Sequence, residues 1–180
     1  MTNKSLCVYC GSSPGKNEIY RAEARKLGKL LAVNKIDLIY GGASIGVMGA
    51  VADSVLENGG SAFGVIPRDL EAREVAHHGL TRLFITNSMH ERKALMANLC
   101  DGFVALPGGF GTYEELFEAI TWSQLQMHRK PIYVVNINGY FNPFIKMVDY
   151  GVEEGFIQQN YLTLFKVVDS VEALIEDFIG

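Results

Sequence analysis

Two glycine-rich segments carry the clearest chemical signal in this sequence. Residues 41–49 read GGASIGVMG, and residues 107–112 read PGGFGT. Each segment follows a short apolar run and precedes an amphipathic stretch, so each is predicted to connect a strand to a helix. Backbone N–H groups and the helix dipole make such a turn an anion site, for which phosphate is the natural ligand. Glycines that serve only a tight turn or close packing would explain the same patterns.

The first segment does not match the common nucleotide-binding motifs. A Walker loop needs Lys after its last glycine, where this chain has Val47, and the spacing does not fit G-x-G-x-x-G. Dinucleotide and triphosphate binding therefore lose support, while Gly42 and Gly46 are candidates for contacts to a ligand. The same residues spell G-x-S-x-G, which leaves open a serine hydrolase with Ser44 as its nucleophile. That motif normally follows several strands, whereas Ser44 is predicted to follow only two.

The second segment places a carboxylate beside the predicted anion site. The helix that follows is expected to begin near Thr112, with Glu115 in its first turn. Thr112 and Glu115 also have the T-x-x-E spacing of a capping box, a structural role that stays open. A carboxylate here would face the sugar of a bound nucleotide and stabilise positive charge that develops at the anomeric carbon. Glu115 is therefore the predicted catalytic residue.

A third segment, SMHERK, supplies positive charge. Ser88 and Glu91 have capping-box spacing, so a helix is predicted to begin at Met89. Arg92 and Lys93 follow near its N-terminus, where cations oppose the helix dipole. This local cost suggests that the two side chains bind a phosphorylated ligand, Arg92 as a bidentate fork. Ordinary solvated charges are the alternative.

The cysteines and histidines do not form a metal signature. Cys7 and Cys10 make a C-x-x-C pair in or just after the first predicted strand. An odd offset sends their side chains to opposite faces of that strand, and no second pair completes a zinc site. The four histidines are scattered through the sequence. We therefore expect no metal site, and both cysteines are interpreted as core or turn residues.

The elements that must position these residues alternate along the chain. The predicted strands cover residues 6–10, 37–40, 62–66, 82–86, 103–106, 132–135 and 166–168, and the predicted helices 17–33, 47–57, 89–99, 113–127, 143–152 and 171–178. Short apolar strands separated by helices indicate a buried, mostly parallel sheet with helices on both faces. The expected fold class is α/β, a Rossmann-like doubly wound sheet with ligands beyond the strand carboxyl ends.

Composition indicates an ordinary globular chain. Of 180 residues, 48% are hydrophobic and 20% charged, and no repeat or linker divides them, so we expect one domain over residues 1–180. A formal net charge of −4 argues against general affinity for nucleic acid. No apolar stretch is long enough to span a bilayer, and three cysteines suit a reducing compartment. We expect a cytoplasmic protein without membrane association.

Together and in this order, YGGASIGVMG, MHERK and PGGFGTYEE resemble the Lonely Guy (LOG) family of cytokinin-activating phosphoribohydrolases. The opening CVYCGSS is also similar to that family, and the similarity runs from Leu6 to about Asn138. The resemblance implies a Rossmann-like homodimer that hydrolyses cytokinin riboside 5′-monophosphates to free base and ribose 5-phosphate, with no organic cofactor. Such proteins are often described as lysine decarboxylases, but this chain has no motif for a pyridoxal phosphate Schiff base.

Position by position, the resemblance makes Arg92 and Glu115 the catalytic pair. It also implies that a further set of residues contacts the nucleotide: Glu74, Lys93, Gly109, Phe110, Gly111, Thr112, Tyr113, Glu114 and Thr121. One departure is Ala43, where the family more often has a third glycine. A methyl group there limits how closely the backbone approaches a ligand.

The expected mechanism is a dissociative hydrolysis. The phosphate is bound by the turn at residues 109–112, the base begins to leave, and Glu115 stabilises the oxocarbenium-like sugar while Arg92 positions substrate and Glu115. The main alternative is a nucleotide or cofactor carrier without chemistry, similar to molybdenum-cofactor carriers, because related folds use similar glycine turns. The preferred base and the proton donor to the leaving base are left open.

Overall fold

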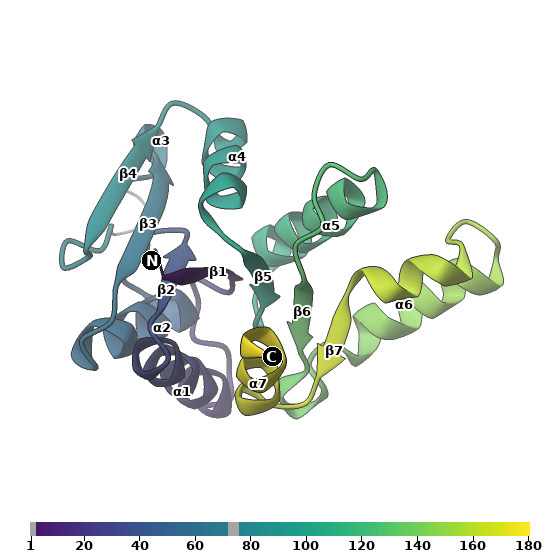
Figure 1. Ribbon diagram of the computed structural model, residues 1–180, viewed down its shortest axis with the longest axis horizontal. Coiled ribbons are helices and arrows are strands. Elements are labelled where there is room, and N and C mark those ends of the chain that lie inside the picture. Colours follow the sequence, from purple (N-terminus) through teal and green to yellow (C-terminus); the bar gives the residue numbers. More distant parts are fainter. Residues whose placement is uncertain (1–2, 72–75) are drawn as a thin grey trace.

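The computed structural model describes residues 3–71 and 76–180 (Figure 1). Helices and strands alternate through both ranges. The strands are β1 (Lys4–Tyr9), β2 (Ile36–Tyr40), β3 (Ala62–Pro67), β4 (Arg82–Thr86), β5 (Gly102–Ala105), β6 (Ile132–Val135) and β7 (Lys166–Val168). The α-helices are α1 (Ile19–Val33), α2 (Gly46–Glu57), α3 (Arg68–Glu71), α4 (Met89–Leu99), α5 (Phe110–Gln124), α6 (Asn142–Glu153) and α7 (Val171–Ile179). Short 3-10 helices, η1 (Ile137–Gly139) and η2 (Gln159–Leu164), flank α6.

The described strands form one sheet in the order β4-β3-β2-β1-β5-β6-β7. Every neighbouring pair in it is parallel. The chain builds outward from β1 through β2, β3 and β4, and then returns to place β5 on the other side of β1. The chain therefore leaves β1 and β5 in opposite directions. This divergence opens a crevice beyond the carboxyl ends of the two strands, where ligands of doubly wound sheets bind.

Helices cover both faces of the sheet, as the alternation predicts. One hydrophobic core lies under α1, α2 and α7, and the other lies under α4, α5 and α6. Figure 1 shows α1, α2 and α7 gathered below the sheet, α4 and α5 above it, and α6 extending away beside β7. Because both faces are buried, the central strands are apolar throughout rather than alternating.

The C-x-x-C pair behaves as the odd offset predicts. Cys7 belongs to the core under α4 and α5, and Cys10 to the core under α1 and α2. Both are buried free thiols.

The described residues contain no group of three or more metal-ligating side chains placed to hold an ion. No helix in the described ranges is long and apolar enough to cross a membrane.

One predicted boundary is wrong in a way that matters for the site. Helix α5 begins at Phe110, with Gly109 as its N-cap, rather than near Thr112. Thr112 therefore lies in the first turn and Glu115 in the second, so the T-x-x-E pair does not form a capping box. Glycines lower helix propensity and masked this start. By contrast, the Ser88 Oγ accepts a hydrogen bond from the Glu91 N–H at 3.1 Å, as the capping-box spacing predicts.

Candidate active site

A cavity of about 270 Å³ lies in the crevice at the carboxyl ends of β1 and β5. Residues 10–12 and residues 109–112 both line it. The side chains of Arg92, Glu114 and Glu115 also line the cavity. The structure thus brings one of the two glycine turns, the cationic segment and the predicted catalytic carboxylate to a single place.

The glycines at the start of α5 differ in what surrounds them. A Cβ on Gly108 would lie 2.0 Å from the Thr112 Oγ1, so this glycine is required by packing. A Cβ on Gly109 or Gly111 would meet nothing within 4 Å, and neither residue has a positive φ. Packing and backbone strain therefore do not explain these two glycines. Both line the cavity, where the absence of side chains leaves the first N–H groups of α5 accessible to an anion.

The other glycine turn has a structural use. Gly42 and Gly46 have φ values of 83° and 66°, which favour glycine. The N–H groups of Val47 and Met48, at the start of α2, both donate to the carbonyl of Gly11, at 3.0 and 3.1 Å. This turn therefore fastens the β1 loop to α2, and two N–H groups of α2 are used within the protein. Contacts from Gly42 and Gly46 to a ligand stay a prediction.

Arg92 and Glu115 form a buried pair on the cavity wall. The Arg92 Nη2 lies 3.6 Å from the Glu115 Oε1, and the two residues are 4% and 5% exposed. Arg92 comes from the first turns of α4 and Glu115 from the second turn of α5. Each of these buried charges is stabilised by the other, because removal of one would leave the other buried without an opposite charge beside it. Solvated charges, the alternative for Arg92, are therefore excluded.

The position of Arg92 depends on its surroundings at both ends. The capping box at Ser88 fixes the start of α4, and the Arg92 N–H continues it with a 3.0 Å bond to the Ser88 carbonyl. At the other end, the guanidinium lies against Gly41, where a Cβ would be only 2.3 Å from Nη2. The buried Arg92 Nε has no hydrogen-bond partner among the described residues. A guanidinium held this way presents donors to a ligand as well as to Glu115.

Lys93 is buried like Arg92 and lies beside the cavity, but it is not among the described residues that line it. Its Nζ donates to Glu114 and, at 2.8 Å, to the Glu118 Oε2. Burial lowers the pKa of Lys93, but the hydrogen bonds to Glu114 and Glu118 outweigh it and raise the pKa above its usual value. Lys93 thus joins α4 to α5 as a permanent cation. Its predicted contact with a nucleotide stays a prediction.

The remaining predicted ligand contacts lie at different distances from the cavity. Phe110 lines its mouth and is 94% exposed. Tyr113 packs its ring against Tyr140 and Phe141. Thr121 is exposed about three helical turns from the start of α5, so the structure does not bring it to the cavity. Glu74 lies outside the described residues.

Comparison with known proteins places the chain in a family. A sequence profile described as "Possible lysine decarboxylase" matches residues 48–178. Over 173 residues the chain is 44% identical to a probable cytokinin riboside 5′-monophosphate phosphoribohydrolase of Oryza sativa subsp. japonica, covering 96% of this chain and 71% of that protein. It is 48% identical over 157 residues to the cytokinin riboside 5′-monophosphate phosphoribohydrolase of Rhodococcoides fascians, covering 87% of this chain and 79% of the relative. This chain belongs to the LOG family.

The fold of this LOG family chain also matches solved structures outside its close relatives. The molybdenum cofactor carrier protein of Chlamydomonas reinhardtii aligns with a TM-score of 0.73 over 97% of this chain and 95% of that one. Sequence identity in this match is 23%, so the likeness shows a shared fold alone. The Rossmann-like architecture predicted from the sequence is confirmed.

Some of the residues that line the cavity were not predicted from the sequence. Residues 10–12, Met48 and Met89 line it but were not predicted as site residues. The available signal was the GSS run directly after the first strand, which meets the second glycine turn because β1 and β5 are neighbours.

Burial, and secondarily the charge of Glu115, raises the pKa of Cys10 well above its usual value. Cys10 is therefore a neutral thiol in the cavity wall and a poor nucleophile.

The geometry around Ser44 does not favour a serine hydrolase in this LOG family chain. His77 lies beside the first glycine turn, since its N–H donates to the Gly42 carbonyl at 2.9 Å. Its Nε2 is 3.0 Å from the Asp53 Oδ1, and its Nδ1 accepts from the Gly79 N–H at 3.1 Å. Both ring nitrogens are thus engaged, and His77 is not poised to take a proton from a serine hydroxyl.

Proposed function

We propose that this protein is a phosphoribohydrolase that cleaves the N-glycosidic bond of cytokinin riboside 5′-monophosphates, yielding free base and ribose 5-phosphate. The observation that carries the proposal is the buried pair of Arg92 and Glu115 beside the open N-terminus of α5. Family membership supports the same activity, because relatives that are 44% and 48% identical bear that name. The chemistry of the cavity and the sequence relationship therefore agree.

The phosphate of the substrate is proposed to bind where α5 begins. Gly109 and Gly111 leave open space there, and the N-terminal end of a 15-residue helix carries a partial positive charge. Thr112, buried at 3% exposure, packs closely against Gly108 in this turn. With the phosphate at this point, the ribose lies toward Arg92 and Glu115, which line the same cavity.

The proposed reaction is a stepwise displacement by water. The bond between the anomeric carbon and the base nitrogen breaks, and its electron pair leaves with the base. The buried carboxylate of Glu115 stabilises the positive charge on the sugar, an interaction that is stronger at a site shielded from water. A water oxygen then bonds to the anomeric carbon, and the base nitrogen gains a proton to balance the one that water loses. Arg92 holds Glu115 and the substrate in place.

The first test is base release with a matched variant. Purified protein is incubated with AMP and with isopentenyladenosine monophosphate, and free base and ribose 5-phosphate are measured by chromatography. Glu115→Gln keeps the shape of the side chain but removes its charge, so we expect kcat to fall by about 10²–10⁴-fold. Its circular dichroism spectrum should match that of the unaltered protein. Full activity in this variant would remove Glu115 from the mechanism.

The same experiment separates hydrolysis from the carrier alternative. A carrier would bind the phosphorylated ligand tightly and return it intact. The likeness to a molybdenum cofactor carrier protein is one of fold, and fold alone does not assign a function. The buried charge pair beside the open helix terminus favours chemistry over storage. Binding of AMP or its prenylated form without release of base would instead favour the carrier.

The name of the matching family profile suggests a different chemistry, which we do not propose. Amino-acid decarboxylases typically use pyridoxal phosphate bound to a lysine through a Schiff base. Such a lysine must lose its proton and have room for the cofactor. Lys93 is the buried lysine beside the cavity, and its amine is held by Glu114 and Glu118 with a raised pKa. These residues do not fit a Schiff base.

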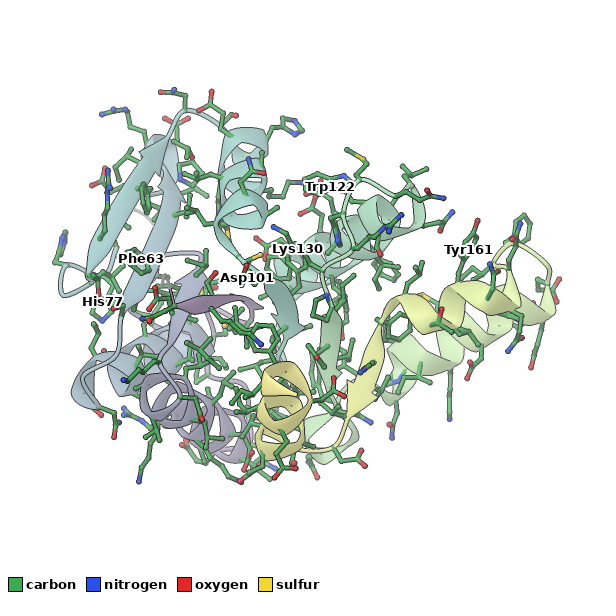
Figure 2. All side chains as sticks on the ribbon, viewed as in Figure 1. Phe63, His77, Asp101, Trp122, Lys130 and Tyr161 are labelled. Atoms are coloured by element: carbon green, nitrogen blue, oxygen red, sulfur yellow. The ribbon has the colours of Figure 1, made fainter. Side chains whose placement is uncertain are left out.

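We also propose that the protein is a cytoplasmic homodimer whose residues 1–180 form one catalytic domain. The single sheet across the described residues supports one domain. Three free thiols suit a reducing compartment. A groove between α4 and α5, lined by Ala94, Trp122 and Met127 among others, supports an interface. Figure 2 labels Trp122 and Lys130, both of which line this groove.

A further inference from the structure

The turn that begins α5 is held from outside the cavity by a tyrosine. The Tyr140 hydroxyl donates a hydrogen bond to the carbonyl of Gly108. Tyr140 follows η1, just beyond the carboxyl end of β6, and β6 lies directly beside β5 in the sheet. It lines a smaller cavity of about 190 Å³ that shares Gly109 with the proposed active site. The two cavities thus lie against the same turn.

The backbone that presents Tyr140 is firmly fixed. Asn138 and Gly139 adopt φ values of 53° and 69°, and such conformations persist where their surroundings hold them. The side chain of Asn136 accepts from the Phe141 N–H at 2.8 Å and donates to the Asn142 Oδ1 at 2.8 Å. These bonds on either side of Tyr140 make it a rigid donor rather than a mobile surface residue.

Packing around the ring of Tyr140 restricts it further. Tyr20 meets it edge-on at a centroid distance of 5.7 Å, and Phe141 does so at 5.1 Å. Tyr113, from α5, stacks on it at 6.4 Å. Burial, together with a hydrogen bond to Tyr140, raises the pKa of Tyr113 to about 12. This neighbouring hydroxyl therefore stays neutral and adds no negative charge beside the phosphate site.

The bond from Tyr140 has a geometric consequence for the anion site. The peptide that joins Gly108 to Gly109 is planar and trans, so its C=O and its N–H point in opposite directions. When the carbonyl of Gly108 points to Tyr140, the N–H of Gly109 must point away from it. Gly109 lines the proposed active site, and a flexible glycine pair would otherwise let this peptide rotate.

We propose that Tyr140 is a positioning residue that orients the Gly109 N–H for the phosphate of the substrate. The inference rests on the proposed function, because it assigns the phosphate to the start of α5. Tyr140 acts through the peptide and touches neither the sugar nor the base. Its loss should therefore weaken the affinity for a phosphorylated ligand and leave the chemical step nearly unchanged.

The test compares Tyr140→Phe with Tyr20→Phe. Each variant removes one hydroxyl from the same aromatic cluster and keeps the ring, but only Tyr140 bonds the turn. We expect Tyr140→Phe to raise KM for the nucleotide about fivefold, the factor typical of one lost neutral hydrogen bond, with kcat within about twofold. Tyr20→Phe should match the unaltered protein.

A binding measurement keeps this test separate from the test of hydrolysis. Titration calorimetry in the Glu115→Gln background compares the affinity for AMP with that for adenosine, which lacks the phosphate. Tyr140→Phe should weaken AMP about fivefold and leave adenosine unchanged. Unchanged AMP affinity, or equal loss for both ligands, would overturn the role of Tyr140. If the unaltered protein released no base, the proposed hydrolysis would be overturned. The calorimetric comparison would still test the role of Tyr140, because it measures binding and not turnover.

Discussion

Arg92 lies against a residue that has no side chain. A Cβ on Gly41 would be 2.3 Å from the Arg92 Nη2, well inside van der Waals contact. Gly41 directly follows β2, while Arg92 belongs to α4, so the two meet only in the folded protein. The guanidinium keeps its 3.6 Å approach to Glu115 because Gly41 leaves room for it. A larger residue at position 41 would therefore displace the Arg92 guanidinium without any substitution of Arg92 itself.

At the residue scale, we predict that Gly41→Ala impairs catalysis through Arg92. The added methyl must push the guanidinium away from Glu115, and small displacements of a positioning group are costly. We expect kcat/KM for the nucleotide to fall about tenfold or more, measured by steady-state kinetics. The control is a double-mutant cycle with Arg92→Ala, in which Gly41→Ala should have little further effect because the guanidinium is already absent. Additive losses would show that Gly41 acts independently of Arg92.

At the element scale, the start of α5 combines glycines of two kinds. Gly108 is packed against Thr112 and Gly11, whereas Gly111 is exposed with open space where a Cβ would lie. A helix of 15 residues would be more stable with Ala than with Gly at position 111. The chain has Gly at this position although Ala would make the helix more stable. Binding of an anion to the N–H groups of the first turn would require such a glycine.

We predict opposite effects on stability and activity from one substitution in this turn. Gly111→Ala should stabilise the fold by about 0.5–1 kcal/mol, a rise of roughly 1–4 °C in Tm, because Ala loses less backbone entropy in a helix. It should also raise KM for the nucleotide about tenfold, since the methyl occupies space beside the anion site. Thermal denaturation and steady-state kinetics measure the two effects.

The matched control for this turn is Gly108→Ala. Its Cβ would lie 2.0 Å from the Thr112 Oγ1 and 2.7 Å from the Gly11 N, so we expect a lower Tm. If Gly111→Ala raised Tm while leaving KM unchanged, the phosphate would have to bind somewhere other than the start of α5.

At the scale of the whole molecule, the groove between α4 and α5 is the face on which we place a second copy of the chain. Its lining includes small side chains at Ala94 and Ala97 and larger apolar groups at Trp122 and Met127. Met127 is 67% exposed in the isolated chain. Symmetric association about a two-fold axis would bury the same face on both copies.

We predict a solution mass of about twice 19.8 kDa by size-exclusion chromatography with light scattering. Met127→Asp should yield the monomer, because an unpaired charge buried at an interface is costly. Met147→Asp, on α6 and 52% exposed, is the matched control and should stay dimeric. A monomeric mass for the unaltered protein would refute the homodimer.

The sequence by itself determined the parts of this protein that depend on short-range order. Apolar runs and amphipathic stretches identified each main strand and helix, and four of them, β4, α4, β6 and β7, have the predicted boundaries. The spacing of Ser88 and Glu91 predicted the cap of α4, and the offset of Cys7 and Cys10 predicted opposite faces. Such features are readable because neighbouring residues on one element interact with each other directly.

Only the tertiary structure decided which of these parts meet. The order of strands is set by the packing of the whole sheet, and it is this order that brings the loop after β1 against the start of α5. Arg92 and Glu115 were predicted separately, but their 3.6 Å approach and joint burial depend on how α4 and α5 pack. Tyr140 gave no sequence signal, because its hydroxyl has meaning only beside the Gly108 carbonyl, 32 residues away along the chain. Local patterns state which faces are buried, whereas partners across the fold follow from three-dimensional packing.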